Sequence, residues 1–243
     1  SHAVKEGLQV ANGEKYLQKF VQVSFHVPEP EAYDLRNWLT EEIHKIHRDE
    51  NESELTQEMS RELSNQIDNF GIMETPRDVI SILNSIKFYY PSVKNDVYFP
   101  DLVLLHTIKI TKPELYNWCE RYLAQWATGA TYYPAYREYG NLEIELNALL
   151  KEELKINNKY LFRLKRLIPG IQSGSGKGTT QVLHTDGLNR GHLLTNKRLG
   201  SPDHWRYYFA FSNPKTSMTD TEIDQISSLA ENDKNKFRER LIE

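Results

Sequence analysis

Helical periodicity over residues 31–126 constrains the fold of this chain more than any other feature of its sequence. Apolar residues recur there every three or four positions. Stop and start signals, such as Gly71 and the Thr111-Lys112-Pro113 triplet, divide the stretch into separate helices. Five are predicted, over 31–47, 53–70, a segment that starts at Thr75, 101–110 and 113–126. Helices of this length with short connections pack as an antiparallel bundle.

Outside this stretch the pattern is less uniform. Residues 18–27 alternate between apolar and polar positions, which predicts one short strand. Residues 127–243 are expected to form a C-terminal helical region, interrupted at 169–202 by a loop that holds seven of the 12 glycines. The predicted fold class is therefore mainly α. We expect divisions near residues 30 and 126, giving the parts 1–30, 31–126 and 127–243.

Composition excludes several classes of protein. The 243 residues carry a formal net charge of −4, which gives no general attraction to nucleic acid or to an anionic membrane. No apolar run approaches the roughly 18 residues of a membrane-spanning helix, so no membrane segment is expected. Cys119 is the single cysteine and favours a reducing, cytoplasmic location; on an apolar helix it is expected to be a packed thiol. Ser1-His2 is interpreted as a cloning remnant.

The third predicted helix carries the strongest candidate for a binding residue. Thr75 is a suitable N-cap, Pro76 suits the first helical position, and Asp78 lies where the helix dipole favours a carboxylate. Arg77 is thereby presented at the start of the helix, where a guanidinium is well placed to bind phosphate oxygens. The alternative for Arg77 is an ordinary ion pair with a neighbouring carboxylate.

Several segments together resemble the KAP family of P-loop NTPases. They are Tyr16-Leu17-Gln18-Lys19-Phe20-Val21-Gln22-Val23 with its following prolines, Pro76-Arg77-Asp78-Val79 with Leu83-Asn84, Tyr90-Pro91-Ser92-Val93-Lys94, Asp101–Leu105 and Lys112–Trp118. A weaker similarity covers 203–225. The resemblance implies that the 18–27 strand is left from an α/β P-loop core and that the following helices form its lid. It also implies that Arg77 contacts the nucleotide and that the upstream P-loop core of the same protein is a partner.

The resemblance further implies ATP and Mg²⁺ as ligands of the parent protein. Their site needs a Gly-x-x-x-x-Gly-Lys-Ser/Thr loop and an acidic residue that organises magnesium, and neither motif occurs in this sequence. The stretch Ser173–Thr180 fails because Ile171 stands at the first glycine position and Gly178 follows the lysine. We therefore expect a lid-side, regulatory portion that does not bind or hydrolyse ATP by itself, and assign it no catalytic residue and no metal ligand.

Two other interpretations remain open. The chain could be a non-catalytic helical module that binds a protein partner through residues 126–243. Within that region, clustered tyrosines and the basic stretch 151–166 would be compatible with nucleic acid, although an ordinary solvated helix face explains them as well. His44 and His47 lie one helical turn apart and could chelate zinc, but a charged stretch follows them and favours an exposed surface.

Overall fold

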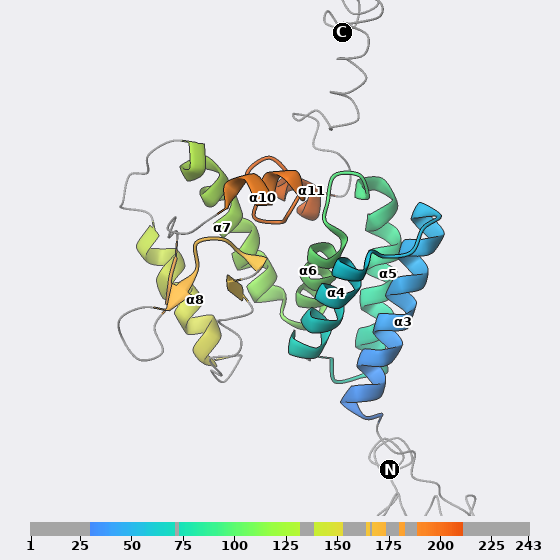
Figure 1. The fold of residues 1–243 in the computed structure, drawn as a ribbon. Coiled ribbons are helices and arrows are strands. Elements are labelled where there is room, and N and C mark those ends of the chain that lie inside the picture. Colours follow the sequence, from blue (N-terminus) through green and yellow to red (C-terminus); the bar gives the residue numbers. More distant parts are fainter. Residues whose placement is uncertain are drawn as a thin grey trace, which may run out of the picture. The chain divides into compact units, whose positions relative to one another are not determined.

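The computed structural model describes residues 30–70, 73–131, 139–152, 164–165, 167–173, 180–182 and 189–210. Within this part of the chain the fold is mainly helical, which confirms the predicted class (Figure 1). The predicted strand at 18–27 and the part of the predicted C-terminal helical region after residue 210 lie outside the described residues. Among the described helices, none combines the length and the apolar character needed to cross a lipid bilayer.

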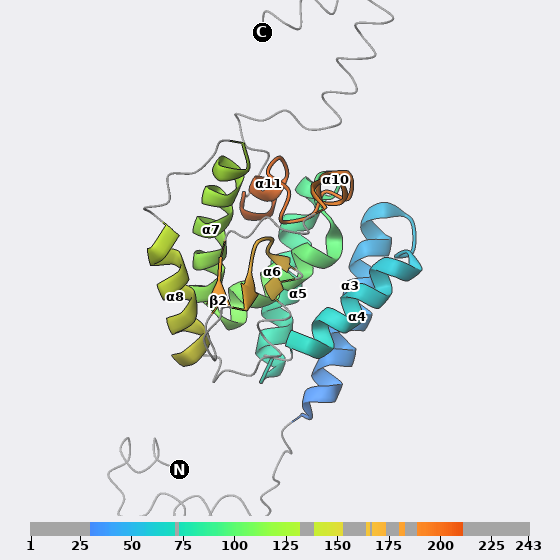
Figure 2. The same ribbon diagram turned by 60° about the vertical axis from the view of Figure 1, so that its left-hand side comes forward.

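The first three described helices follow the predicted pattern. They are α3 (Ala32–Asn51), α4 (Gln57–Phe70) and α5 (Pro76–Val93). Helix α4 starts four residues later than predicted because Thr56, rather than Ser53, accepts a hydrogen bond from the Met59 amide at 3.2 Å. Helices α3 and α5 pack together and begin at the same end in both views (Figures 1 and 2).

Helix α6 (Phe99–Thr111) is the centre of the helical core. Ten consecutive residues from Phe99 to Ile108 are buried, so this helix is covered on all sides. It packs against α4, α5 and the following helix α7 (Pro113–Thr131). Its apolar composition explains this position, because a helix that is apolar around its whole circumference belongs inside a protein.

The remaining elements are shorter. Helix α8 (Tyr139–Glu152) packs on α7, and the strands β1 (Gln172–Ser173) and β2 (Thr180–Gln181) form an antiparallel pair beside α8. Helices α10 (Arg190–Thr195) and α11 (Trp205–Phe209) follow. The predicted loop at 169–202 thus contains β1, β2 and α10 within its described residues. The three-part division at residues 30 and 126 stays a prediction.

Trp38 is the main departure from the predicted helix faces. The sequence pattern groups it with Leu35, Leu39 and Ile43 on the buried stripe of α3. Those three residues are buried, whereas Trp38 is 37% exposed. It lies at the margin of the stripe, where the period of 3.6 residues brings a side chain to the edge of the packed face.

Candidate functional site

A reciprocal set of hydrogen bonds fixes the start of α5 and with it the position of Arg77. The Thr75 hydroxyl accepts a hydrogen bond from the Asp78 amide at 3.2 Å, and the Asp78 carboxylate accepts one from the Thr75 amide at 2.9 Å. The same carboxylate accepts a second bond from the Glu74 amide at 3.1 Å. This capping box begins the helix one residue before Arg77, as the sequence predicts.

The Arg77 side chain is exposed at this capped helix start. Within the part of the chain that the structure describes, its guanidinium takes part in no hydrogen bond or ion pair, and the adjacent Asp78 is occupied by backbone amides. The local ion pair that was the alternative for Arg77 is therefore not formed among these residues. Unlike Arg77, the buried Val79, Ile82 and Leu83 hold the rest of α5 in the core.

We expect Thr75→Ala to lower the free energy of unfolding by about 1 kcal/mol, because the amide of Asp78 loses its acceptor at the start of α5. Urea denaturation of the purified chain measures this change. Asn84→Ala, on the exposed side of the same helix, is the matched control and should change the free energy by less than about 0.5 kcal/mol. Equal effects of the two variants would contradict the capping role of Thr75.

The described residues do not form a complete nucleotide site. Among them, Arg77 has no hydrogen-bond or ion-pair partner, and a guanidinium at a helix start suits a phosphate oxygen. Among the described residues, no three histidine, cysteine or acidic side chains come together as metal ligands would. Of the stretch Ser173–Thr180, the structure describes only the two end residues, which pair in the β1–β2 hairpin.

The two histidines considered for zinc have structural partners instead. His47 is buried, and its Nδ1 lies 2.9 Å from the Tyr90 hydroxyl and its ring lies against Phe99. Burial lowers the pKa of His47, which favours the neutral imidazole. His44 lies 3.4 Å from the Ser60 hydroxyl. Cys119 is buried as predicted, and burial raises the pKa of its thiol, which does not suit a nucleophile.

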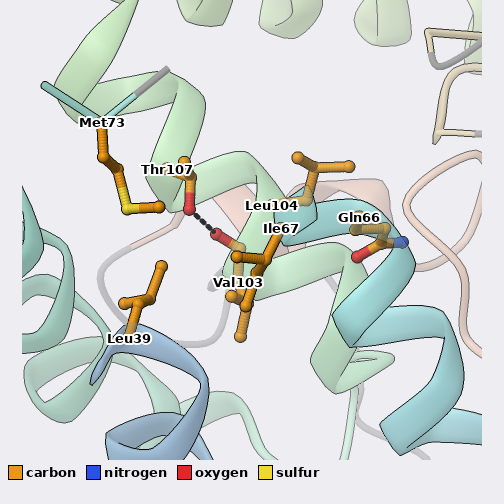
Figure 3. A pocket seen from close by; sticks show the side chains of 7 residues that line it. All are labelled: Leu39, Gln66, Ile67, Met73, Val103, Leu104 and Thr107. Atoms are coloured by element: carbon orange, nitrogen blue, oxygen red, sulfur yellow. Dashed lines mark hydrogen bonds between the residues drawn. The ribbon is translucent and has the colours of Figure 1, made fainter. Parts of the chain in front are cut away.

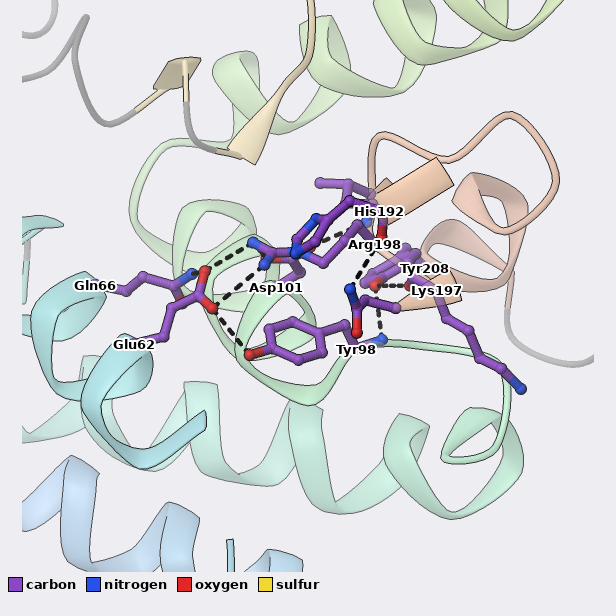
Figure 4. Close-up of polar contacts among 10 residues, drawn as sticks. Glu62, Gln66, Tyr98, Asp101, His192, Lys197, Arg198 and Tyr208 are labelled. Atoms are coloured by element: carbon purple, nitrogen blue, oxygen red, sulfur yellow. Dashed lines mark hydrogen bonds and ion pairs between the residues drawn. The ribbon is translucent and has the colours of Figure 1, made fainter. Parts of the chain in front are cut away.

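A partly buried ionic cluster lies between α4, α6 and the chain after α10 (Figure 4). The Arg198 guanidinium donates to both oxygens of Asp101, each at 2.8 Å, and to Glu62 at 2.7 Å. The Leu199 amide adds a bond of 3.0 Å to Asp101. Arg198 also lies over the Tyr98 ring, 4.4 Å from its centroid. The cluster thus joins α4, α6 and the chain after α10.

The electrostatics keep Arg198 charged. Burial alone would lower its pKa, but Asp101 and Glu62 outweigh burial, and the pKa of Arg198 is raised. Burial raises the pKa of the Tyr98 hydroxyl, and the nearby Glu62 raises it further. Tyr98 therefore stays neutral and donates its hydroxyl hydrogen to Glu62 at 2.9 Å. Because every member of the cluster has a partner, it functions as a structural link between helices.

Sequence reasoning did not identify this cluster. Arg198 lies 97 residues from Asp101 and 136 residues from Glu62, so no local spacing connects them. The available signal was Asp101 itself, a carboxylate at the start of an otherwise apolar helix. A charge buried in such a helix requires a partner of opposite charge.

A small pocket lies between α3, α4 and α6 (Figure 3). Its lining is almost entirely apolar and consists of Leu39, Gln66, Ile67, Met73, Val103, Leu104 and Thr107. The Thr107 hydroxyl donates to the Val103 carbonyl at 2.8 Å and so does not offer its hydrogen to a ligand. The Gln66 side-chain oxygen is buried and has no hydrogen-bond partner among the described residues. The pocket marks imperfect packing beneath α4.

Comparison with protein families identifies the class of protein. Residues 1–93 match the model of the KAP family P-loop domain. This part of the chain is similar to the KAP family of P-loop NTPases, which confirms the resemblance. A P-loop implies nucleotide binding for that family. The match includes Arg77 and ends at the last residue of α5.

A curated relative extends the similarity beyond the family match. The Phage T7 exclusion protein of Escherichia coli (strain K12) is 36% identical over 219 residues. The aligned region is 88% of this chain and 29% of that protein, so the chain spans less than a third of the length of this relative. No solved structure is significantly similar to the chain.

Proposed function

We propose that the chain is the lid-side, regulatory portion of a KAP P-loop ATPase, in which Arg77 contacts the phosphates of ATP bound by the P-loop core. The observation that carries this proposal is an exposed arginine fixed by a capping box at a helix start, within a segment that matches the P-loop domain. If Arg77 makes this contact only when nucleotide is present, ATP binding changes the position of the helices. That change would in turn alter the binding of a partner protein.

The division of labour follows from the residues present. Arg77 supplies a positive charge and hydrogen-bond donors for phosphate oxygens. The capped start of α5 fixes the backbone from which the Arg77 side chain extends, so binding has to order the side chain but not the helix start. ATP, with Mg²⁺, supplies the reacting phosphoryl group. The phosphate-binding loop and the magnesium-organising carboxylate of this proposal belong to the rest of the parent protein, since neither motif occurs in these 243 residues.

We expect Arg77→Ala to lower the turnover of ATP by the full-length parent protein by about 10²-fold, because the developing charge on the phosphoryl group loses a fixed donor. Steady-state phosphate release, measured at saturating ATP, tests this. Arg77 is exposed and forms no ion pair among the described residues, so the melting temperature should remain unchanged.

Lys87→Ala is the matched control, since Lys87 is an exposed cation on the same helix as Arg77. Its turnover should equal that of the wild type. Arg77→Lys should recover part of the activity, because a lysine keeps the charge but not the planar fork of donors. Wild-type turnover in Arg77→Ala would overturn the nucleotide contact.

The name of the relative suggests a biological setting. We extend the proposal to exclusion of bacteriophage by the parent protein, on the basis of 36% identity to a Phage T7 exclusion protein. Plaque counts of phage T7 on cells that express the full-length protein provide the assay. Reduced plating that Arg77→Ala restores would support both parts of the proposal, whereas equal plating with and without the protein would exclude this setting.

A further inference from the structure

Helix α4 contributes less to the core than its neighbours. Among those of its side chains that the structure describes, only Leu63 and Ile67 are buried, whereas α6 buries ten consecutive residues. Helix α4 packs on α3 and α6. An element with few buried apolar side chains opens more readily than the rest of a fold.

The packing beneath α4 is also incomplete. The small pocket described above has Gln66 and Ile67 of α4 on one side and Val103 and Leu104 of α6 on another (Figure 3). The buried Gln66 oxygen has no hydrogen-bond partner there. Both features reduce the free energy that α4 gains from its closed position, because missing contacts and unpaired polar atoms each carry a cost.

Polar contacts at one residue compensate for this weak packing. Glu62 of α4 accepts hydrogen bonds from Arg198 at 2.7 Å and from the Tyr98 hydroxyl at 2.9 Å (Figure 4). Both donors belong to segments outside α4. Asp68 of α4 forms a second ionic contact, with Arg36 of α3 at 3.5 Å, but the Asp68 side chain is 70% exposed. Glu62 is therefore the less exposed of the two ionic contacts that hold α4 to other segments among the described residues.

The two carboxylates that bind Arg198 differ in their surroundings. The Asp101 side chain is 1% exposed, and its bonds to Arg198 and the Leu199 amide are closed to water. The Glu62 side chain is 27% exposed, so water can replace its partners when the contact breaks. Breaking the contact to Glu62 thus costs far less than breaking the contact to Asp101, so Arg198 is expected to stay paired with Asp101 when α4 moves away.

We propose that α4 is a releasable flap, held closed by a latch that consists of Glu62 on the flap and Arg198 with Tyr98 on the fixed part of the protein. In the open state Glu62 is hydrated, Arg198 remains paired with Asp101, and the apolar pocket surface of α3 and α6 becomes accessible. This inference does not depend on the nucleotide contact of Arg77, since it concerns a different residue cluster.

Hydrogen exchange of the purified chain, followed by mass spectrometry, tests the latch. Glu62→Gln removes the charge while keeping the size of the side chain. We expect the amides of α4 to exchange about tenfold faster in this variant, while those of α6 and α7 keep their wild-type rates. Tyr98→Phe, which removes one donor to Glu62 and keeps the ring on Arg198, should produce a smaller increase in the same helix.

Arg61→Gln is the matched control, because Arg61 is the exposed neighbour of Glu62 on the same helix. It should leave the exchange of α4 unchanged. Thr107→Cys adds a second measurement, since a thiol at this pocket position should react with a thiol reagent faster when combined with Glu62→Gln. Unchanged exchange of α4 in Glu62→Gln, or an equal increase in all helices, would overturn the proposal.

Discussion

We expect Arg198→Met to lower the free energy of unfolding by about 3–5 kcal/mol. This is the largest effect that we expect from substituting any one charged residue. The substitution leaves the Asp101 carboxylate buried without a cation, and removing one partner of a buried pair typically costs this much. The Asp101 side chain is 1% exposed, so water cannot replace the lost donors. Urea denaturation followed by circular dichroism measures the change.

A double variant distinguishes the loss of an ion pair from the loss of packing. Arg198→Met combined with Asp101→Leu removes the charges of both Arg198 and Asp101. It should be more stable than Arg198→Met alone, because the fully buried carboxylate is gone and the remaining Glu62, which is 27% exposed, can be hydrated. Arg61→Met, at an exposed arginine of α4, should change the free energy by less than about 0.5 kcal/mol. A double variant less stable than the single one would show that the cluster is not governed by its charges.

Trp118→Ala is expected to lower the free energy of unfolding by about 3–5 kcal/mol, the usual cost of truncating a fully buried tryptophan. Trp118 has no exposed surface, its ring stacks on Tyr122 at 4.9 Å, and its indole nitrogen donates to the Leu142 carbonyl at 3.0 Å. The substitution therefore leaves a cavity between α7 and α8 and removes the side-chain hydrogen bond to the Leu142 carbonyl. Thermal or urea denaturation provides the measurement.

Phe88→Ala is the comparison for Trp118→Ala, because Phe88 is a large aromatic residue of α5 that is 59% exposed. It should change the stability by less than about 1 kcal/mol. Trp118→Phe should recover part of the loss, since the smaller ring still fills much of the site but cannot donate to Leu142. Comparable losses in Trp118→Ala and Phe88→Ala would contradict the position of Trp118 in the core.

The helices were predictable because their signals are local. The Thr75 cap and the Pro113 start each act within one turn, so the sequence places both helix starts correctly. The start of α4 was misplaced because Ser53 and Thr56 are both competent caps, and only the packed structure selects Thr56. Local chemistry identifies the candidates at a helix end, and tertiary contacts choose among them.

The candidate site was predictable only in part, and for the same reason. Arg77 is presented by its own capping box, so its exposure follows from neighbouring residues. The partners of Arg198 are separated from it by about a hundred residues or more, and no periodicity links them. Trp38 illustrates a different limit. Its apolar side chain predicts burial, but the sequence does not show whether another helix packs against that part of α3.

The cation that Asp101 requires comes from the chain after α10, and this has a consequence for how the protein can be divided. Cutting the chain anywhere between α8 and Lys197 separates a buried carboxylate from its only ionic partner among the described residues. It also removes the acceptor of the Trp126 indole, since that nitrogen donates to the Gly200 carbonyl at 3.1 Å. A fragment that retains α4, α6 and α7 must therefore also retain residues 197–210 to keep both of these contacts.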